Sequence, residues 1–213
     1  MHNFIKTYIV ILGLVISGFS YGQSPYKPMK DTASFKKSMA EVAKKTRTLK
    51  SDFVQEKNLS VLSEKIISKG KFYFKKDNLL RWEYSEPFQY LIVLNGESVL
   101  IKDGQKVSKY DVQSNKLFKE INDMMVGMIQ GKILSNKMFD IAFLENEKYF
   151  IIQSQPLQKN KKEFLQDIFL FFDKKDLGVE KINITEPSGD YTEIIFTNRQ
   201  TNTEIPDAEF IVK

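Results

Sequence analysis

Few residue types in this sequence could carry out chemistry. The chain has no cysteine and one histidine, His2, which lies in a segment that we expect to be removed. A mature chain without either residue excludes Ser-His-Asp and Cys-His nucleophilic catalysis, thiol redox chemistry and nearly all zinc and copper sites. Paired carboxylates could still perform acid–base work, but Asp and Glu fall mostly on predicted outward faces and turns. We therefore expect no enzyme, no metal and no cofactor.

The most informative spacing lies between Gly70 and Tyr84, where large apolar residues recur at every second position. This is the period of a β-strand, so two adjacent strands would present one apolar face. Its members are Phe72, Phe74, Leu80, Trp82 and Tyr84. Lys76 continues this face, and burying an unpaired lysine is costly. The face is either ordinary core or the wall of a cavity for an apolar ligand, and Lys76 favours the cavity.

The first 22 residues read as a signal peptide. A basic start is followed by an apolar run from Tyr8 to Phe19, and small residues, Ser20 and Gly22, stand where a signal peptidase needs them. The run is shorter than the roughly 20 residues of a bilayer span. We expect residues 23–213 to form one exported domain without disulfides, which must rely on its apolar core.

An amphipathic helix is expected first in this domain, because apolar residues recur at helical spacing from Phe35 to Leu49, with Asp31 or Thr32 as its N-cap. Short strands separated by turn signals follow, among them Lys69-Gly70, Asn95-Gly96 and Asp103-Gly104. The expected strands are 51–57, 61–68, 71–76, 79–84, 90–94, 98–102, 106–112, 139–144, 149–154, 164–172, 179–186, 191–198 and 209–212.

A second helix is predicted within residues 121–134, between two of these strands. Its apolar face is rich in methionine, a flexible side chain that suits variable apolar partners. That face consists of Ile121, Met124, Met125, Met128 and Ile129. The pattern favours a mainly β, α+β fold: one strongly curved antiparallel sheet with helices on its concave side. A closed lipocalin-type barrel is the alternative.

Charge adds little to the choice of partner. The chain has 32 Lys and Arg against 27 Asp and Glu, a net charge of +5, and the two signs are interspersed. Nucleic-acid binding would require clustered basic residues with a recognisable motif. We expect no nucleic-acid partner and a monomer.

The aromatic segment and its surroundings resemble the LolA family of periplasmic lipoprotein carriers. The resemblance rests on Gly-x-Phe-x-Phe-Lys-Lys-x-Asn-Leu-Leu-Arg-Trp at 70–82, then Glu86-Pro87, a short apolar strand and Asn95-Gly96. Further matching segments are Asp-Phe-Val-Gln at 52–55 and Ile-Pro-Asp-Ala-Glu-Phe at 205–210.

This resemblance implies an unclosed half-barrel whose apolar concave face is covered by helices and binds the acyl chains of lipoproteins. The protein would be a transport chaperone that takes acylated lipoproteins from an inner-membrane ABC transporter across the periplasm to an outer-membrane acceptor. The acyl-binding residues would be Phe53, Phe72, Phe74, Leu80, Trp82, Tyr84, Ile92 and Leu94. The lid would comprise Lys76, Met124, Met125, Met128 and Ile129.

One departure concerns the lid. Family members usually have Arg-Pro where this chain has Lys76-Asp77, and lysine lacks the planar fork of donors of arginine. Two other functions fit the same fold: a carrier of another lipid or glycolipid, and a sensor of lipids.

Overall fold

A computed structural model describes residues 26–76, 78–96, 98–111, 127, 139–158 and 162–212. Within these ranges the chain forms one 12-stranded antiparallel sheet in the order β1-β8-β9-β10-β11-β12-β2-β3-β4-β5-β6-β7. The strands are β1 Lys27–Pro28, β2 Thr48–Asn58, β3 Ile66–Lys75, β4 Leu79–Glu86, β5 Tyr90–Asn95, β6 Ser98–Asp103, β7 Lys106–Asp111, β8 Phe139–Glu145, β9 Tyr149–Pro156, β10 Asp167–Asp173, β11 Val179–Thr185 and β12 Tyr191–Thr201.

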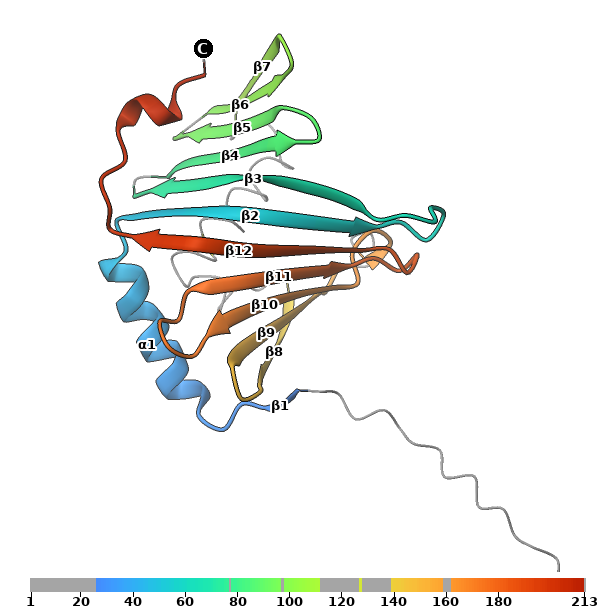
Figure 1. Cartoon of the computed structure of the whole chain (residues 1–213). Coiled ribbons are helices and arrows are strands. Elements are labelled where there is room, and N and C mark those ends of the chain that lie inside the picture. The colour runs from blue at the N-terminus through green and yellow to red at the C-terminus, as the bar shows by residue number, and fades with distance from the viewer. Residues whose placement is uncertain are drawn as a thin grey trace, which may run out of the picture.

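The sheet is curved and unclosed, with β1 and β7 at its two edges (Figure 1). This confirms the expected half-barrel and excludes the closed barrel. An early strand and a late strand of the chain meet at the centre of the sheet, because β12 pairs with β2 along most of their lengths. Hairpin turns occur at the two predicted glycines, and both have the positive φ that favours glycine, +61° at Gly96 and +57° at Gly104.

Helix α1, Thr32–Lys45, begins at Asp31, whose side chain accepts a hydrogen bond from the Ser34 N–H at 2.9 Å. This N-cap satisfies a backbone donor that the first helical turn leaves unpaired. The buried side chains of α1 are Phe35 and Met39. Phe35 packs against aromatic rings of β8, β9 and β10, with the Phe150 centroid at 5.0 Å. The helix therefore covers the half of the concave face that these strands form.

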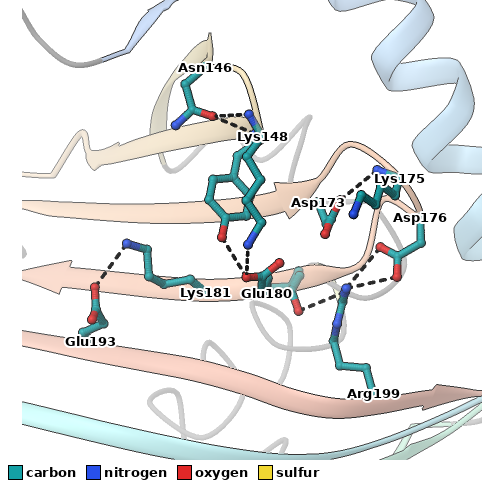
Figure 2. Close-up of polar contacts among 11 residues, drawn as sticks. Asn146, Lys148, Asp173, Lys175, Asp176, Glu180, Lys181, Glu193 and Arg199 are labelled. Carbon is teal, nitrogen blue, oxygen red and sulfur yellow. Dashed lines mark hydrogen bonds and ion pairs between the residues drawn. The ribbon is translucent and has the colours of Figure 1, made fainter.

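The main hydrophobic core lies on the concave face and joins both halves of the sheet. Strand alternation sends residues such as Phe53, Phe72 and Trp82 from one half, and Leu170 and Phe172 from the other, into one cluster. On the opposite, convex face polar side chains pair across strands. Figure 2 shows two examples, Lys181 with Glu193 at 3.2 Å and Lys148 with Glu180 at 2.6 Å.

The prediction of a turn at Lys69-Gly70 is wrong. Strand β3 runs through Gly70, and residues 59–65 form the loop that precedes it. Gly70 lies opposite Phe53 of β2, and a Cβ at this position would come within 2.6 Å of the Phe53 ring and 1.9 Å of the Glu83 carbonyl oxygen. This glycine is thus required by close packing inside a strand and does not mark a turn.

The predicted last strand at 209–212 is also wrong. Asp207–Phe210 forms a 3₁₀-helix, η2, and the segment lies over the convex face of β4 and β5. Phe210 and Ile205 pack there on Tyr73 and Val93 in a second apolar cluster. Figure 1 shows this segment as the red chain beside the ends of β3 to β6. An isolated apolar alternation cannot distinguish such a covering segment from an edge strand.

Two predicted elements fall outside the described residues, apart from Gly127, which is helical. These are the signal peptide, residues 1–22, and the methionine-rich helix with Met124, Met125, Met128 and Ile129. Of the helices in the described ranges, none has the length and apolar composition that a membrane span needs.

Candidate functional site

The eight predicted acyl-binding residues gather in the concave cluster. Six are buried, Phe53, Phe72, Phe74, Leu80, Trp82 and Leu94, and two pack against them half-buried, Tyr84 and Ile92. The register places them side by side, since Phe72 pairs with Trp82 and Trp82 with Ile92. The alternation in the sequence is therefore the correct one for these strands. Binding of acyl chains by these residues stays a prediction.

Aromatic rings dominate this part of the cluster. The Trp82 centroid lies 4.9 Å from that of Phe53, 5.3 Å from Phe72 and 5.9 Å from Phe196. At the edge of the group, the Tyr84 hydroxyl donates to Gln55 Oε1 at 3.0 Å. Burial raises the pKa of this hydroxyl, so it remains a neutral donor. The cluster is therefore apolar with a polar margin.

A cavity of about 290 Å³ opens between α1 and the middle of the sheet. Of the predicted residues Phe72 lines it, whereas the other seven lie in the adjoining cluster. Its apolar wall is completed by residues that sequence reasoning did not assign to a site: Met39, Val42, Leu49, Phe172, Leu177, Val179, Ile182 and Phe196. The apolar stripe of α1 was a signal for Met39 and Val42. The residues of β10, β11 and β12 lie beside those of β2 and β3 only because β12 pairs with β2.

The exposed end of the cavity is polar. Lys45, Asp176, Arg199 and Asn202 line it there. The Arg199 guanidinium donates to both carboxylate oxygens of Asp176, at 3.0 and 3.3 Å, and to the Val179 carbonyl (Figure 2). A Cβ added to Gly178 would come within 1.9 Å of the Arg199 guanidinium, so the glycine leaves room for the guanidinium at this position. The cavity thus combines an apolar interior with a charged margin, as a site for an amphipathic ligand does.

Lys76 is exposed and follows the end of β3, in the turn towards β4. Its backbone N–H donates to the Arg47 carbonyl at 2.7 Å. The argument that Lys76 is a costly buried charge is therefore wrong, because water reaches its side chain. A role in holding a lid stays a prediction, since the other predicted lid residues lie outside the described ranges.

The carboxylates near the aromatic strands form ion pairs. Glu83 accepts from Arg81 at 3.0 Å, and Glu86 pairs with Lys69 at 2.9 Å on the exposed surface. Among the residues that the structure describes, no group of three or more potential metal ligands comes together.

Comparison with known proteins gives the family. The profile of the family described as outer membrane lipoprotein carrier protein LolA matches residues 44–213. An outer-membrane lipoprotein carrier protein of Leptothrix cholodnii is 26% identical over 151 residues, which are 70% of this chain and 66% of the relative. One of Methylococcus capsulatus is 28% identical over 131 residues, 62% of this chain and 55% of the relative. The chain thus spans about half to two thirds of the length of these relatives.

Solved structures support the fold. An uncharacterized conserved protein of Thermus thermophilus has a TM-score of 0.54 at 9% identity, with 84% of this chain and 93% of that chain covered. The complex of MucA and MucB from Pseudomonas aeruginosa gives 0.52 at 14% identity, with 86% and 62% covered. At such identities the likeness concerns the fold alone. The family profile, however, covers most of the chain, and the chain belongs to the LolA family.

Proposed function

We propose that this protein is a carrier that shelters the acyl chains of lipoproteins in the periplasm. The observation that carries the proposal is the apolar concave face with its cavity of about 290 Å³ under α1, in a chain of the LolA family. An acyl chain in water exposes several hundred Å² of apolar surface, and shielding it gains roughly 25 cal/mol per Å². A preformed apolar hollow supplies that shielding.

Within this proposal the carrier moves lipoproteins from the inner to the outer membrane. It receives them from an inner-membrane ABC transporter and delivers them to an outer-membrane acceptor. Support comes from the names of the relatives, which are outer-membrane lipoprotein carrier proteins. No catalytic step is part of this function.

The test identifies what the protein carries. The full chain is expressed in a Gram-negative host, purified from the periplasm without detergent and analysed by native mass spectrometry. We expect a mass increment equal to an acylated lipoprotein or lipopeptide. A free lipid or glycolipid in its place would move the protein to the alternative function, and a protein that emerges empty and ignores added lipopeptide would refute the carrier.

A matched pair of variants locates the cargo. Val42 lines the cavity, whereas Val54 lies on the convex face and is 37% exposed. Val42→Lys places a charge in the cavity and should abolish co-purification of cargo, because burying an unpaired ammonium is costly. Val54→Lys should leave cargo unchanged. Equal cargo on both variants would place binding elsewhere.

A further inference from the structure

Ser51 is a buried polar residue in the cavity wall. It is 2% exposed and lines the cavity from β2. Its Oγ has no hydrogen-bond partner within the part of the chain that the structure describes. Most buried polar atoms of proteins are paired, and leaving a hydroxyl unpaired away from water costs free energy. An unpaired hydroxyl in the wall of a hollow points to a ligand that completes its hydrogen bonding.

The immediate surroundings of Ser51 are apolar. Across the ladder it faces Phe72, and Leu49 is its neighbour on the same face of β2. Both side chains line the same cavity, as does Phe196 of β12. A hydrocarbon chain alone would leave the hydroxyl unpaired in these surroundings. A ligand that brings one acceptor into the apolar hollow would pair it.

We propose that Ser51 Oγ donates a hydrogen bond to the carbonyl oxygen of the ester or amide that links an acyl chain to its cargo. This inference rests on the proposed function and deepens it. The carbonyl is the acceptor that every ester- or amide-linked acyl chain carries, at the junction of its apolar and polar parts. Ser51 would then make the cavity prefer acyl groups over hydrocarbon chains attached in other ways.

The test compares two synthetic lipopeptides of equal chain length, one with ester-linked chains and one with ether-linked chains, which lack the carbonyl. Affinities are measured by titrating the protein with each lipopeptide, with Trp82 emission and calorimetry as the two readouts. The wild-type protein should bind the ester about three- to tenfold more tightly, the contribution expected of one net hydrogen bond. Ser51→Ala should bind both lipopeptides equally, at the wild-type affinity for the ether.

Ser154 is the matched control. It is a fully buried serine whose partners across the ladder include the core residue Ile168, and its Oγ is likewise unpaired, but it does not line this cavity. Ser154→Ala should keep the ester preference. Ser51→Ala should also keep or raise the melting temperature of the empty protein, because it removes an unpaired buried hydroxyl. If the Ser51 hydroxyl instead stabilised the fold, Ser51→Ala would lower that melting temperature.

The outcomes separate the two proposals. Equal binding of ester and ether by the wild-type protein overturns the role of Ser51 and leaves the carrier function standing. Loss of the preference in Ser154→Ala, or its retention in Ser51→Ala, overturns that role as well. Failure of the wild-type protein to bind either lipopeptide refutes the carrier function itself.

Discussion

Gly70 illustrates how one residue type can be dictated by the packing of two neighbouring strands. The site is closed by the Phe53 ring and by the backbone of Glu83. A backbone carbonyl cannot move aside as the end of a side chain can, so an added methyl group must push β3 and β4 apart. The aromatic cluster around Phe53 and Trp82 depends on that spacing.

We predict that Gly70→Ala destabilises the protein by about 3 kcal/mol, the upper range of overpacking effects. Chemical denaturation measures the change. Gly96→Ala is the control, because its φ of +61° is strained for alanine but, apart from its chain neighbours, no residue that the structure describes comes within 4 Å of the new Cβ. That variant should lose only about 1–2 kcal/mol, from its left-handed conformation. Equal losses would contradict the role of packing at Gly70.

Glu145 couples stability to pH. Its buried carboxylate accepts from Lys174 Nζ at 2.9 Å and from the Lys30 N–H at 3.3 Å. The hydrogen bond from Lys174 is the largest cause that lowers the pKa of Glu145 below its ordinary value of 4.5, while burial opposes it. Because the folded state binds this proton less tightly than the unfolded state, the stabilisation is present above pH 4.5 and is lost as pH falls through the lowered pKa.

Glu145→Gln should therefore cost about 1 kcal/mol at pH 7, and the difference from the wild type should shrink below pH 4.5. Thermal unfolding across this range checks the prediction. Glu147→Gln, at an exposed position two residues further on, should change stability by less than about 0.5 kcal/mol at pH 7. A difference for Glu145→Gln that stays constant with pH would contradict the assignment.

At the scale of elements, the C-terminal segment packs on the convex face of the sheet and is held there by hydrogen bonds. Lys75 donates to the Ile205 carbonyl at 3.0 Å, and Arg81 to the Glu209 carbonyl at 3.0 Å. Directly after the second contact Phe210 is 1% exposed, whereas the adjacent Ile211 is 54% exposed. The segment thus adds a second core to a sheet whose first core is concave.

Phe210→Ala should destabilise the protein by about 3–5 kcal/mol, the usual cost of emptying a buried aromatic site. Ile211→Ala should cost less than about 0.5 kcal/mol. Both are measured by urea unfolding. A small loss for Phe210→Ala would mean that the segment lies loosely on the sheet.

Most elements could be predicted from the conformational preferences of residues that are close in the sequence. An N-cap at Asp31, one of the two predicted candidates, follows from capping preferences, the turns at Gly96 and Gly104 from positive φ, and the alternation from Phe72 to Tyr84 from the strand period. Gly70 was misread because a glycine inside a strand and a glycine in a turn look alike without knowledge of the opposing strand.

The candidate site was only half predictable for a related reason. Phe72 and Trp82 lie in sequence-adjacent strands, so a single alternation places them together. Phe196, by contrast, joins them because β12 pairs with β2, a strand that lies far from it in the sequence. No local pattern specifies that pairing, and Ser51 acquires its interest only once the cavity is known.

At the scale of the whole molecule, the sheet and α1 leave an apolar hollow that ordinary packing would fill. Protein interiors are close-packed, and cavities cost stability. Under the proposed function, a cavity of about 290 Å³ beside the aromatic cluster would trade stability for binding capacity. Filling the cavity should therefore move these two properties in opposite directions.

Val42→Phe tests this balance, because Val42 projects from α1 into the cavity. The larger ring can occupy free space without displacing the sheet, so stability should rise by about 0.5–2 kcal/mol, as for other cavity-filling changes. Affinity for a lipopeptide with long acyl chains should fall by about tenfold, and affinity for one with short chains should fall less. Thermal unfolding and calorimetry on the same samples measure both effects, with Val54→Phe on the convex face as the control that should leave binding unchanged. A variant that gains stability and binds long chains as well as the wild type would show that this cavity is not where the cargo lies.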